Sequence, residues 1–462
     1  MELKEVQDEL TKIKLTEEII TVEFIKRVFG KHLTVLDLSN HFIFEKSSAM
    51  LIKLLKSLFT NKKDLKFLVL QNCMISSSNL IKILKLFALN SKTFKHLDIS
   101  NNRLQIEPAL SLHISILFSK TLKLKSLSLQ GNICSNAQAI SEIFTHNIRL
   151  QELNLYDTNL SPESLTIISQ ILSQNTTIFK LNLGFNAQAF DDPEIVRLFA
   201  DSVSENRYIE ELNLSGNDSL GVVDNLRQFC EGIKGNRSLS ILKLGGVNLE
   251  DFGVKVLMSH LMKELPVSSL DIQNNNIRDP GFKALMLELP VTLVSLDASY
   301  NTLRETSSIV SLSTFLIETK SLRKLNISHS FELENLESGV VDLLCEALSK
   351  NDSLSDFLCE GVKIPEDPDL FCYKLNQAIA YRKLSLTYKI SAVNCFTNES
   401  STNSIISNEK SMKIISAIPS NLSHFKEKES NSQTERKEYV ETPDQEPIVN
   451  TSRHYDISTS FD

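Results

Sequence analysis

The 462-residue sequence contains no tryptophan and few of the residues that interrupt regular structure, with 13 Gly and 11 Pro. These are roughly 3% and 2% of the chain, against about 7% and 5% in average proteins. So few turn-forming residues exclude a collagen-like chain and argue against a β-sandwich with many tight turns. The composition instead indicates helices joined by short connections.

Other features are also missing. No apolar run approaches the length that a membrane-spanning helix needs, so we expect no membrane span. Residues 1–10 are highly charged, and we expect no secretory signal there. The 7 cysteines are scattered without a C-x-x-C pair, which predicts reduced thiols in a cytoplasmic protein. A net charge of -8 gives no reason to expect nucleic-acid binding.

Motifs for catalysis are missing as well. The sequence has no G-x-x-x-x-G-K-[ST] loop for phosphates and no H-E-x-x-H or paired Cys/His spacing for a metal. We therefore predict a non-enzymatic protein with no cofactor and no metal site.

The sequence does contain a repeated pattern of apolar residues. The frame L-x-x-L-x-L-x-x-N-x-L recurs twelve times between residues 33 and 364, with a mean spacing of about 29 residues. Its L-x-L alternation predicts a short strand with one buried face. Positions are counted below from the first residue of each frame, taken as position zero. The frames start at Leu33, Leu65, Phe94, Leu124, Leu150, Ile178, Ile209, Leu239, Val267, Leu293, Leu322 and Leu354.

Polar residues mark the turns of each repeat. An Asn at position eight has a side-chain amide suited to satisfying backbone groups inside the turn. Ser161, Asp192 and Asp279 each precede a proline, which predicts helix N-caps. A second Asn, three residues before a frame, predicts a left-handed helix C-cap. The Asn at position eight are Asn102, Asn132, Asn186, Asn217, Asn275 and Asn301; the predicted C-caps are Asn147, Asn175, Asn206, Asn236 and Asn351.

On these residues the chain resembles leucine-rich-repeat proteins of the ribonuclease-inhibitor-like class, over residues 33–364. The resemblance implies an α/β solenoid, a horseshoe with a parallel concave β-sheet and convex α-helices. The class includes ribonuclease inhibitor, sensor regions of NOD-like receptors, tropomodulin-like actin regulators, Ran GTPase-activating protein and effectors of intracellular bacteria. It therefore implies protein binding in general and leaves the partner open.

The segments outside the repeats differ in composition. Residues 1–32 are predicted to form a helical N-terminal cap and residues 365–390 a C-terminal cap, because the end repeats would otherwise expose their cores. Residues 391–462 are rich in Ser, Thr and Asn and poor in apolar residues, which predicts a disordered polar tail. The tail also resembles export signals of bacterial effectors, which leaves open a secreted protein acting in a host cytosol.

The predicted concave face carries more acidic than basic residues. Positions two, four and six point outward from each strand, and there eight acids are opposed by Lys180, Lys243 and Lys324. One interpretation is attraction of a partner with a basic surface; the other is a general preference for polar residues on solvated strands. The acids are Asp37, Asp98, Glu152, Glu211, Asp271, Asp297, Asp356 and Glu360.

Aromatic residues are the other candidates, because they often dominate the energetics of interfaces. We predict a monomeric scaffold that binds a partner protein on this face. The predicted partner-binding residues are Phe67, Asp98, Glu152, Tyr156, Phe185, Glu211, Asp271, Asp297 and Tyr300. One alternative is a GTPase activator of the Ran activator type, for which Arg103 would supply the exposed arginine. The other is a secreted bacterial effector that binds a host protein.

Overall fold

A computed structural model describes residues 34–60, 65–90, 93–121, 124–145, 149–260, 265–290, 292–333, 338–362 and 374–375. All of them lie in one unit, Met1–Phe396. The predicted N-terminal cap at 1–32, the predicted tail at 391–462 and most of the predicted C-terminal cap at 365–390 lie outside the described residues. In that last segment, Leu375 is buried and Lys374 forms an ion pair with Asp342.

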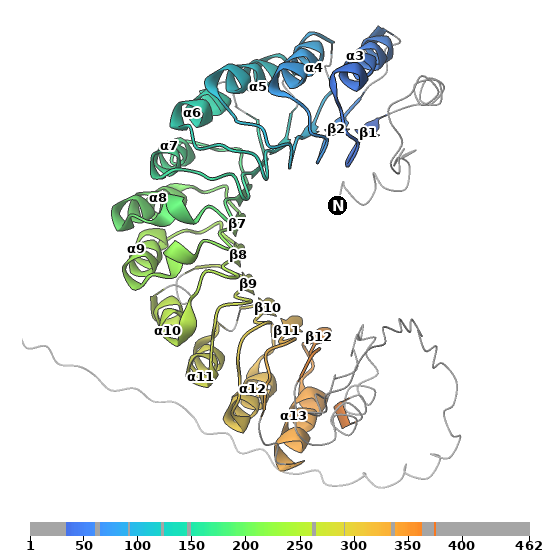
Figure 1. Ribbon diagram of the computed structural model, residues 1–462. Helices are drawn as coiled ribbons and strands as arrows, with labels where there is room; N and C mark the ends of the chain where they lie inside the picture. The colour runs from blue at the N-terminus through green and yellow to red at the C-terminus, as the bar shows by residue number, and fades with distance from the viewer. Residues whose placement is uncertain are drawn as a thin grey trace, which may run out of the picture. The chain divides into compact units, whose positions relative to one another are not determined.

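Each predicted frame forms one short strand, and the strands make one parallel sheet in chain order, β1 to β12. Equivalent residues of neighbouring frames pair in register, as Leu36 does with Leu68. Figure 1 shows the strands following one another along the inner side of the repeats. They are β1 Val35–Asp37, β2 Phe67–Val69, β3 His96–Asp98, β4 Ser126–Ser128, β5 Glu152–Asn154, β6 Lys180–Asn182, β7 Glu211–Asn213, β8 Ile241–Lys243, β9 Ser269–Asp271, β10 Ser295–Asp297, β11 Lys324–Asn326 and β12 Asp356–Leu358.

A helix follows each strand from β1 to β11 and lies on the outer side of the repeats (Figure 1). The helices are α3 Glu45–Thr60, α4 Ser77–Asn90, α5 Pro108–Thr121, α6 Ala137–Thr145, α7 Pro162–Leu172, α8 Pro193–Glu205, α9 Val223–Ile233, α10 Glu250–His260, α11 Asp279–Glu288, α12 Thr306–Glu318 and α13 Ser338–Lys350. Two short 3-10 helices, η1 Ala187–Phe190 and η2 Asp218–Gly221, precede α8 and α9. Among the described residues, no helix combines the length and the hydrophobicity needed to cross a bilayer.

The core lies between the sheet and the helices. The middle residue of every strand is buried, while its two neighbours are partly accessible on the inner face. Each helix adds apolar residues three and four apart, such as Leu165, Ile168 and Leu172 of α7. The buried residues form one continuous cluster along the repeats. The fold class is therefore the predicted leucine-rich-repeat solenoid.

The Asn at position eight binds backbone groups inside the turn, as predicted, and it also binds backbone groups of the preceding repeat. The Asn186 Oδ1 atom accepts hydrogen bonds from the N–H groups of Thr158 and Leu160, at 3.1 and 3.0 Å. Its amide nitrogen donates to the carbonyl oxygens of Leu155 and Leu183 at 2.8 and 3.0 Å. The same arrangement recurs at Asn102, Asn132, Asn275 and Asn301. These buried amides join each repeat to the next.

The Asn before each frame also binds across repeats, but the predicted left-handed C-cap is wrong. Asn206 has φ -69° and ψ 130°, and no described member of the set has positive φ. The Asn206 amide nitrogen donates to the Leu172 carbonyl at 2.8 Å, at the end of α7 in the preceding repeat. Its Oδ1 accepts from the Tyr208 and Ile209 N–H groups. Asn236 and Asn351 bond in the same way, whereas Asn147 lies outside the described residues.

The left-handed residue lies instead at position seven, where each strand ends. All twelve frames have φ between +52° and +75° there. A turn at that point directs the chain away from the sheet, and Gly, Asn and Asp adopt this conformation most easily. The residues are Asn40, Asn72, Asn101, Gly131, Asp157, Phe185, Gly216, Gly246, Asn274, Tyr300, His329 and Gly361.

Two of the three predicted helix caps are confirmed. Ser161 accepts a hydrogen bond from the Ser164 N–H, and Asp192 accepts one from the Glu194 N–H. Asp279 is the exception, because it lies inside the first turn of α11. Its carboxylate accepts from the Arg304 and Glu305 N–H groups, both at 3.0 Å. Asp279 therefore caps the helix of the following repeat.

Candidate protein-binding surface

Four of the predicted acids lie at position four and bind the backbone there. Asp37, Asp98, Asp271 and Asp297 each accept a hydrogen bond from the backbone N–H two residues later. In four other repeats an Asn accepts this bond, at Asn154, Asn182, Asn213 and Asn326. In these eight repeats an oxygen acceptor binds the backbone N–H, and Asn serves as well as Asp, so the bond does not need a negative charge.

Glu211 forms ion pairs with two of the three lysines that were expected to oppose the acidic face. Its carboxylate lies 2.9 Å from the Lys180 Nζ and 2.8 Å from the Lys243 Nζ, and its side chain is 15% exposed. Burial alone would raise the pKa of the Glu211 carboxyl, but the hydrogen bonds and charges of Lys243 and Lys180 lower it. The charge of Glu211 is therefore compensated by lysines of the two neighbouring strands. The negative charge of the inner face comes mainly from the other acids.

Asp271 and Asp297 form a pair of like charges on adjacent strands. They are direct neighbours in the register of β9 and β10. Burial is the main cause that raises the pKa of the Asp271 carboxyl, and the charge of Asp297 adds to it. A hydrogen bond from the Gln273 N–H at 3.1 Å opposes this rise. Like charges placed opposite each other destabilise a sheet.

We expect Asp271→Asn to increase the free energy of unfolding at pH 7. The raised pKa means that the folded state binds the proton more tightly, so the stability linked to this group is lost as the pH rises through the folded pKa. The side-chain amide of the variant does not titrate, so the variant does not lose this stability as the pH rises. Its oxygen can still accept the hydrogen bond from the Gln273 N–H. The gain should shrink as the pH falls below about 4, because both states are then protonated. Urea unfolding at several pH values measures it, and a gain that is independent of pH would contradict the explanation.

Tyr156 and Phe185 form an aromatic pair where β5 and β6 end. Their ring centroids lie 4.9 Å apart at an interplanar angle of 45°. Each ring occupies space above a glycine of the neighbouring repeat. A Cβ atom on Gly184 would lie 2.9 Å from the Tyr156 ring, and one on Gly216 would lie 2.3 Å from the Phe185 ring. The pair therefore depends on two glycines that leave room for it.

Phe185 occupies an unfavourable backbone conformation while its side chain stays accessible. It has φ +54° at position seven, where eight of the other repeats have Asn or Gly. A bulky residue with positive φ is an outlier, and such strain is often found at functional sites. The side chain is nevertheless 52% exposed, so burial does not account for it.

Two further aromatic pairs lie on the same sheet. Phe67 stacks on His96 across β2 and β3, with centroids 4.2 Å apart. Tyr300 stacks on His329 with centroids 4.7 Å apart, and Tyr300 is 55% exposed. His329 is not among the predicted partner-binding residues, although it shares position seven with Phe185 and Tyr300.

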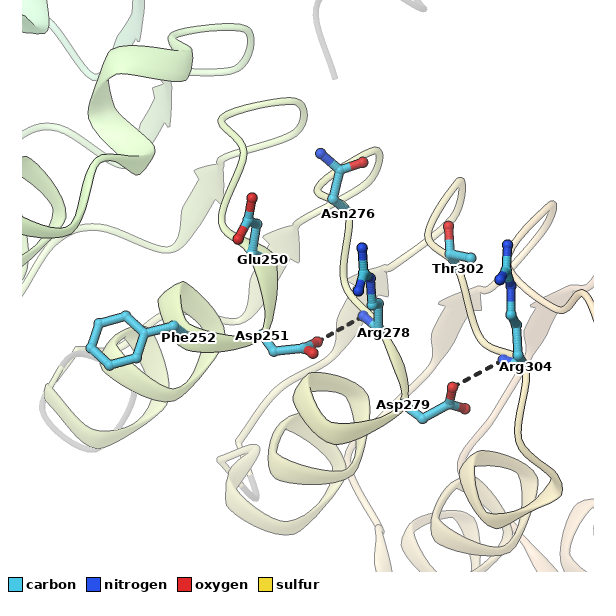
Figure 2. Close-up of a pocket in the computed structure, with 8 residues that line it drawn as sticks. All are labelled: Glu250, Asp251, Phe252, Asn276, Arg278, Asp279, Thr302 and Arg304. Carbon is cyan, nitrogen blue, oxygen red and sulfur yellow. Dashed lines mark hydrogen bonds between the residues drawn. The ribbon is translucent and has the colours of Figure 1, made fainter.

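A hollow of about 760 Å³ opens beside the loop that carries Tyr300. In Figure 2 the Arg278 and Arg304 side chains point in the same direction, above Asp251 and Asp279. The two carboxylates accept from the backbone N–H groups of these arginines, at 2.7 and 3.0 Å, so they hold the loops in place. The guanidinium groups remain exposed on the surface. Arg and Tyr are, with Trp, the residue types enriched in interface hot spots.

The nine predicted partner-binding residues do not form one compact site. Glu152, Tyr156, Phe185 and Glu211 lie on three successive strands or at their ends, and they form the central group. The remaining residues lie two or more repeats away on either side. Phe67 and Asp98 belong to β2 and β3, and Asp271, Asp297 and Tyr300 belong to β9 and β10 or its end. We call the inner face and the ends of its strands, from β5 to β11, the candidate surface.

Among the described residues, no group of three or more His, Cys, Asp or Glu side chains is placed to hold a metal ion. Arg103, the arginine of the GTPase-activator alternative, is exposed where β3 ends and has φ +56°. GTPase activation through Arg103 stays a prediction.

Twelve repeats with this register make the chain a leucine-rich-repeat protein. The family model described as "Leucine Rich repeat" matches residues 205–223 and 266–286, which contain β7 and β9.

Two curated relatives come from mammals. The mouse "NACHT, LRR and PYD domains-containing protein 4E" is 29% identical over 234 residues, which cover 50% of this chain and 22% of the mouse protein. The human "NACHT, LRR and PYD domains-containing protein 14" is 26% identical over 181 residues, which cover 38% of this chain and 16% of the human protein. The matched region is thus about a fifth of the length of these relatives.

Two solved structures from bacteria are also similar. The leucine-rich repeat-containing protein LegL7 from Legionella pneumophila is 22% identical with a TM-score of 0.46, covering 66% of this chain and 95% of that one. An internalin, inlF, from Listeria monocytogenes is 14% identical with a TM-score of 0.38, covering 84% of this chain and 94% of that one.

Proposed function

We propose that this chain is a non-enzymatic interaction scaffold that binds a partner protein on the candidate surface. Tyr156 and Phe185 are the anchor of the interface. The observation that carries this proposal is the conformation of Phe185, which is left-handed and half-exposed above Gly216. Such a residue lowers stability without filling the core, so its use is best explained by contact with a partner.

Charge supports a partner with a basic surface. Asp271 and Asp297 stay side by side although an Asn would meet the same backbone requirement, as it does at Asn213 and Asn326. A cationic partner would relieve this repulsion and gain electrostatic attraction on approach. The Asp pair therefore gives charge selectivity, and the aromatic pair gives contact area.

The proposal also includes action in a reducing compartment. Cys73, Cys134, Cys230 and Cys345 form no disulfide, and three of these four are buried. Burial raises the pKa of the Cys73 thiol to about 12, so that this thiol stays protonated and unreactive at neutral pH.

Affinity capture followed by mass spectrometry tests the proposal. We expect Tyr156→Ala to lose the partner that the parent chain captures, while circular dichroism stays unchanged. Leu198→Ala is the matched control, because Leu198 is exposed on the outer helix α8 of the repeat that contains Phe185. Glu211→Lys is unsuitable as a probe, since it would place a third positive charge between Lys180 and Lys243. Equal capture by Tyr156→Ala and the parent chain would refute the proposed site.

A further inference from the structure

Positive charge gathers at the edge of the sheet where the strands begin, which we call the start edge. Lys66, Lys95 and Lys125 occupy position one of three successive frames. Their backbones are joined directly, since the Lys95 N–H donates to the Lys66 carbonyl at 2.8 Å and the Lys125 N–H donates to the Lys95 carbonyl at 2.7 Å. The three lysines therefore lie one strand spacing apart, about 4.8 Å.

A hollow of about 910 Å³ continues this row toward β7. It is lined by four cationic side chains, Lys95, Lys125, Arg149 and Arg207, against one carboxylate, Glu210. Phe179 and Tyr208 also line it, and Tyr208 is 48% exposed. The hollow thus combines cations with aromatic surface.

The lysines of the start edge differ from those of the inner face in their surroundings. Lys180 and Lys243 both pair with Glu211, and Lys324 lies 3.7 Å from Asp356. By contrast, the ammonium groups of Lys66, Lys95 and Lys125 form no ion pair with another residue of the described part of the chain. Neighbouring like charges of this kind destabilise a sheet unless an anion compensates them.

We propose that the start edge from β2 to β7 binds a short acidic segment of a partner protein in extended conformation. The positive strip is narrow, because Asp98 of β3 and Glu152 of β5 lie on the adjoining strands and Glu210 lines the far end of the hollow. A broad polyanion such as duplex nucleic acid or a membrane surface would meet these carboxylates as well, whereas a single extended chain would not. Phe179 and Tyr208 would contact apolar side chains of the segment.

This surface is separate from the aromatic pair of Tyr156 and Phe185. Position one precedes each three-residue strand and position seven follows it, six residues later, so the two are at most about 20 Å apart. One partner, or two, could therefore occupy both edges of the sheet at once. The prediction is independent of Tyr156 and Phe185, so the two proposals can fail separately.

Fluorescence anisotropy with a labelled octaglutamate peptide tests the inference on the full chain. We expect Lys95→Glu/Lys125→Glu to weaken binding at least tenfold and added salt to weaken it as well, because the attraction is between exposed charges. Lys255→Glu, on the outer helix α10, is the matched charge control and should bind like the parent chain. Tyr156→Ala should also bind like the parent chain.

Three results would overturn the inference. The first is absence of binding by the parent chain at low salt, and the second is equal binding by Lys95→Glu/Lys125→Glu. The third is tighter binding of an oligonucleotide of equal charge, or of phosphatidylserine vesicles, than of the peptide, which would assign the start edge to nucleic acid or to membrane.

Discussion

Asn186→Ala is expected to lower the free energy of unfolding by about 3–5 kcal/mol, because several buried backbone groups would lose their partner at once. The Asn186 side chain is 3% exposed. Its loss would leave the Thr158 and Leu160 N–H groups and the Leu155 carbonyl without the amide. Each buried group left unsatisfied costs about 1–3 kcal/mol.

Two variants sharpen this experiment, which uses urea unfolding followed by circular dichroism. Gln188→Ala, at an exposed position two residues later, should change the free energy of unfolding by less than about 0.5 kcal/mol. Asn186→Thr should lower the free energy of unfolding less than Asn186→Ala does. Thr158 occupies position eight of its own frame, and its hydroxyl donates to the Leu155 carbonyl at 2.7 Å. A loss below about 1 kcal/mol for Asn186→Ala would contradict the role of the amides in joining the repeats.

Phe185→Asn is expected to separate stability from binding. Asn occupies position seven in four other repeats and tolerates positive φ, so the free energy of unfolding should stay unchanged or rise by up to about 1 kcal/mol. Partner binding should weaken by about 2 kcal/mol, or roughly 30-fold, because an interface anchor is removed. Unfolding experiments and titration with the captured partner measure the two effects.

Tyr300→Asn is the matched control for Phe185→Asn. It also replaces an aromatic residue by Asn at position seven, where φ is +55°, and it lies four repeats along the sheet. The effect on stability should be similar at both positions, whereas the effect on binding should be larger at Phe185 if the central group is the anchor. A Phe185→Asn variant that is less stable and binds normally would show that Phe185 is structural.

The sequence was sufficient to predict the strands, because the leucine spacing determines both the strand and its buried face. Each of the twelve frames contains one strand of the sheet. The left-handed turn was not predictable in the same way, since position seven holds Asn, Gly, Asp, Phe, Tyr and His. What these residues share is a backbone angle, which a pattern of side chains does not express. The Asn before each frame was assigned that angle, although it acts through its side chain.

The candidate site was harder to predict because its partners lie in different repeats. Asp279 precedes a proline like Asp192, yet its carboxylate binds backbone groups 25 and 26 residues later. Glu211 appeared as an exposed acid, whereas Lys180 and Lys243 approach it from both neighbouring strands. The row of lysines at position one could not be predicted from the outward strand positions, because position one precedes each strand.

Hydrogen–deuterium exchange of the chain, free and bound to its captured partner, tests the central claim most directly. Our account predicts slower exchange on binding in residues 182–186 and 213–217, where β6 and β7 end beside Phe185 and Tyr156. The outer helices α7 to α9 should exchange as in the free chain. Protection confined to those helices, with no change at the ends of the strands, would contradict the account.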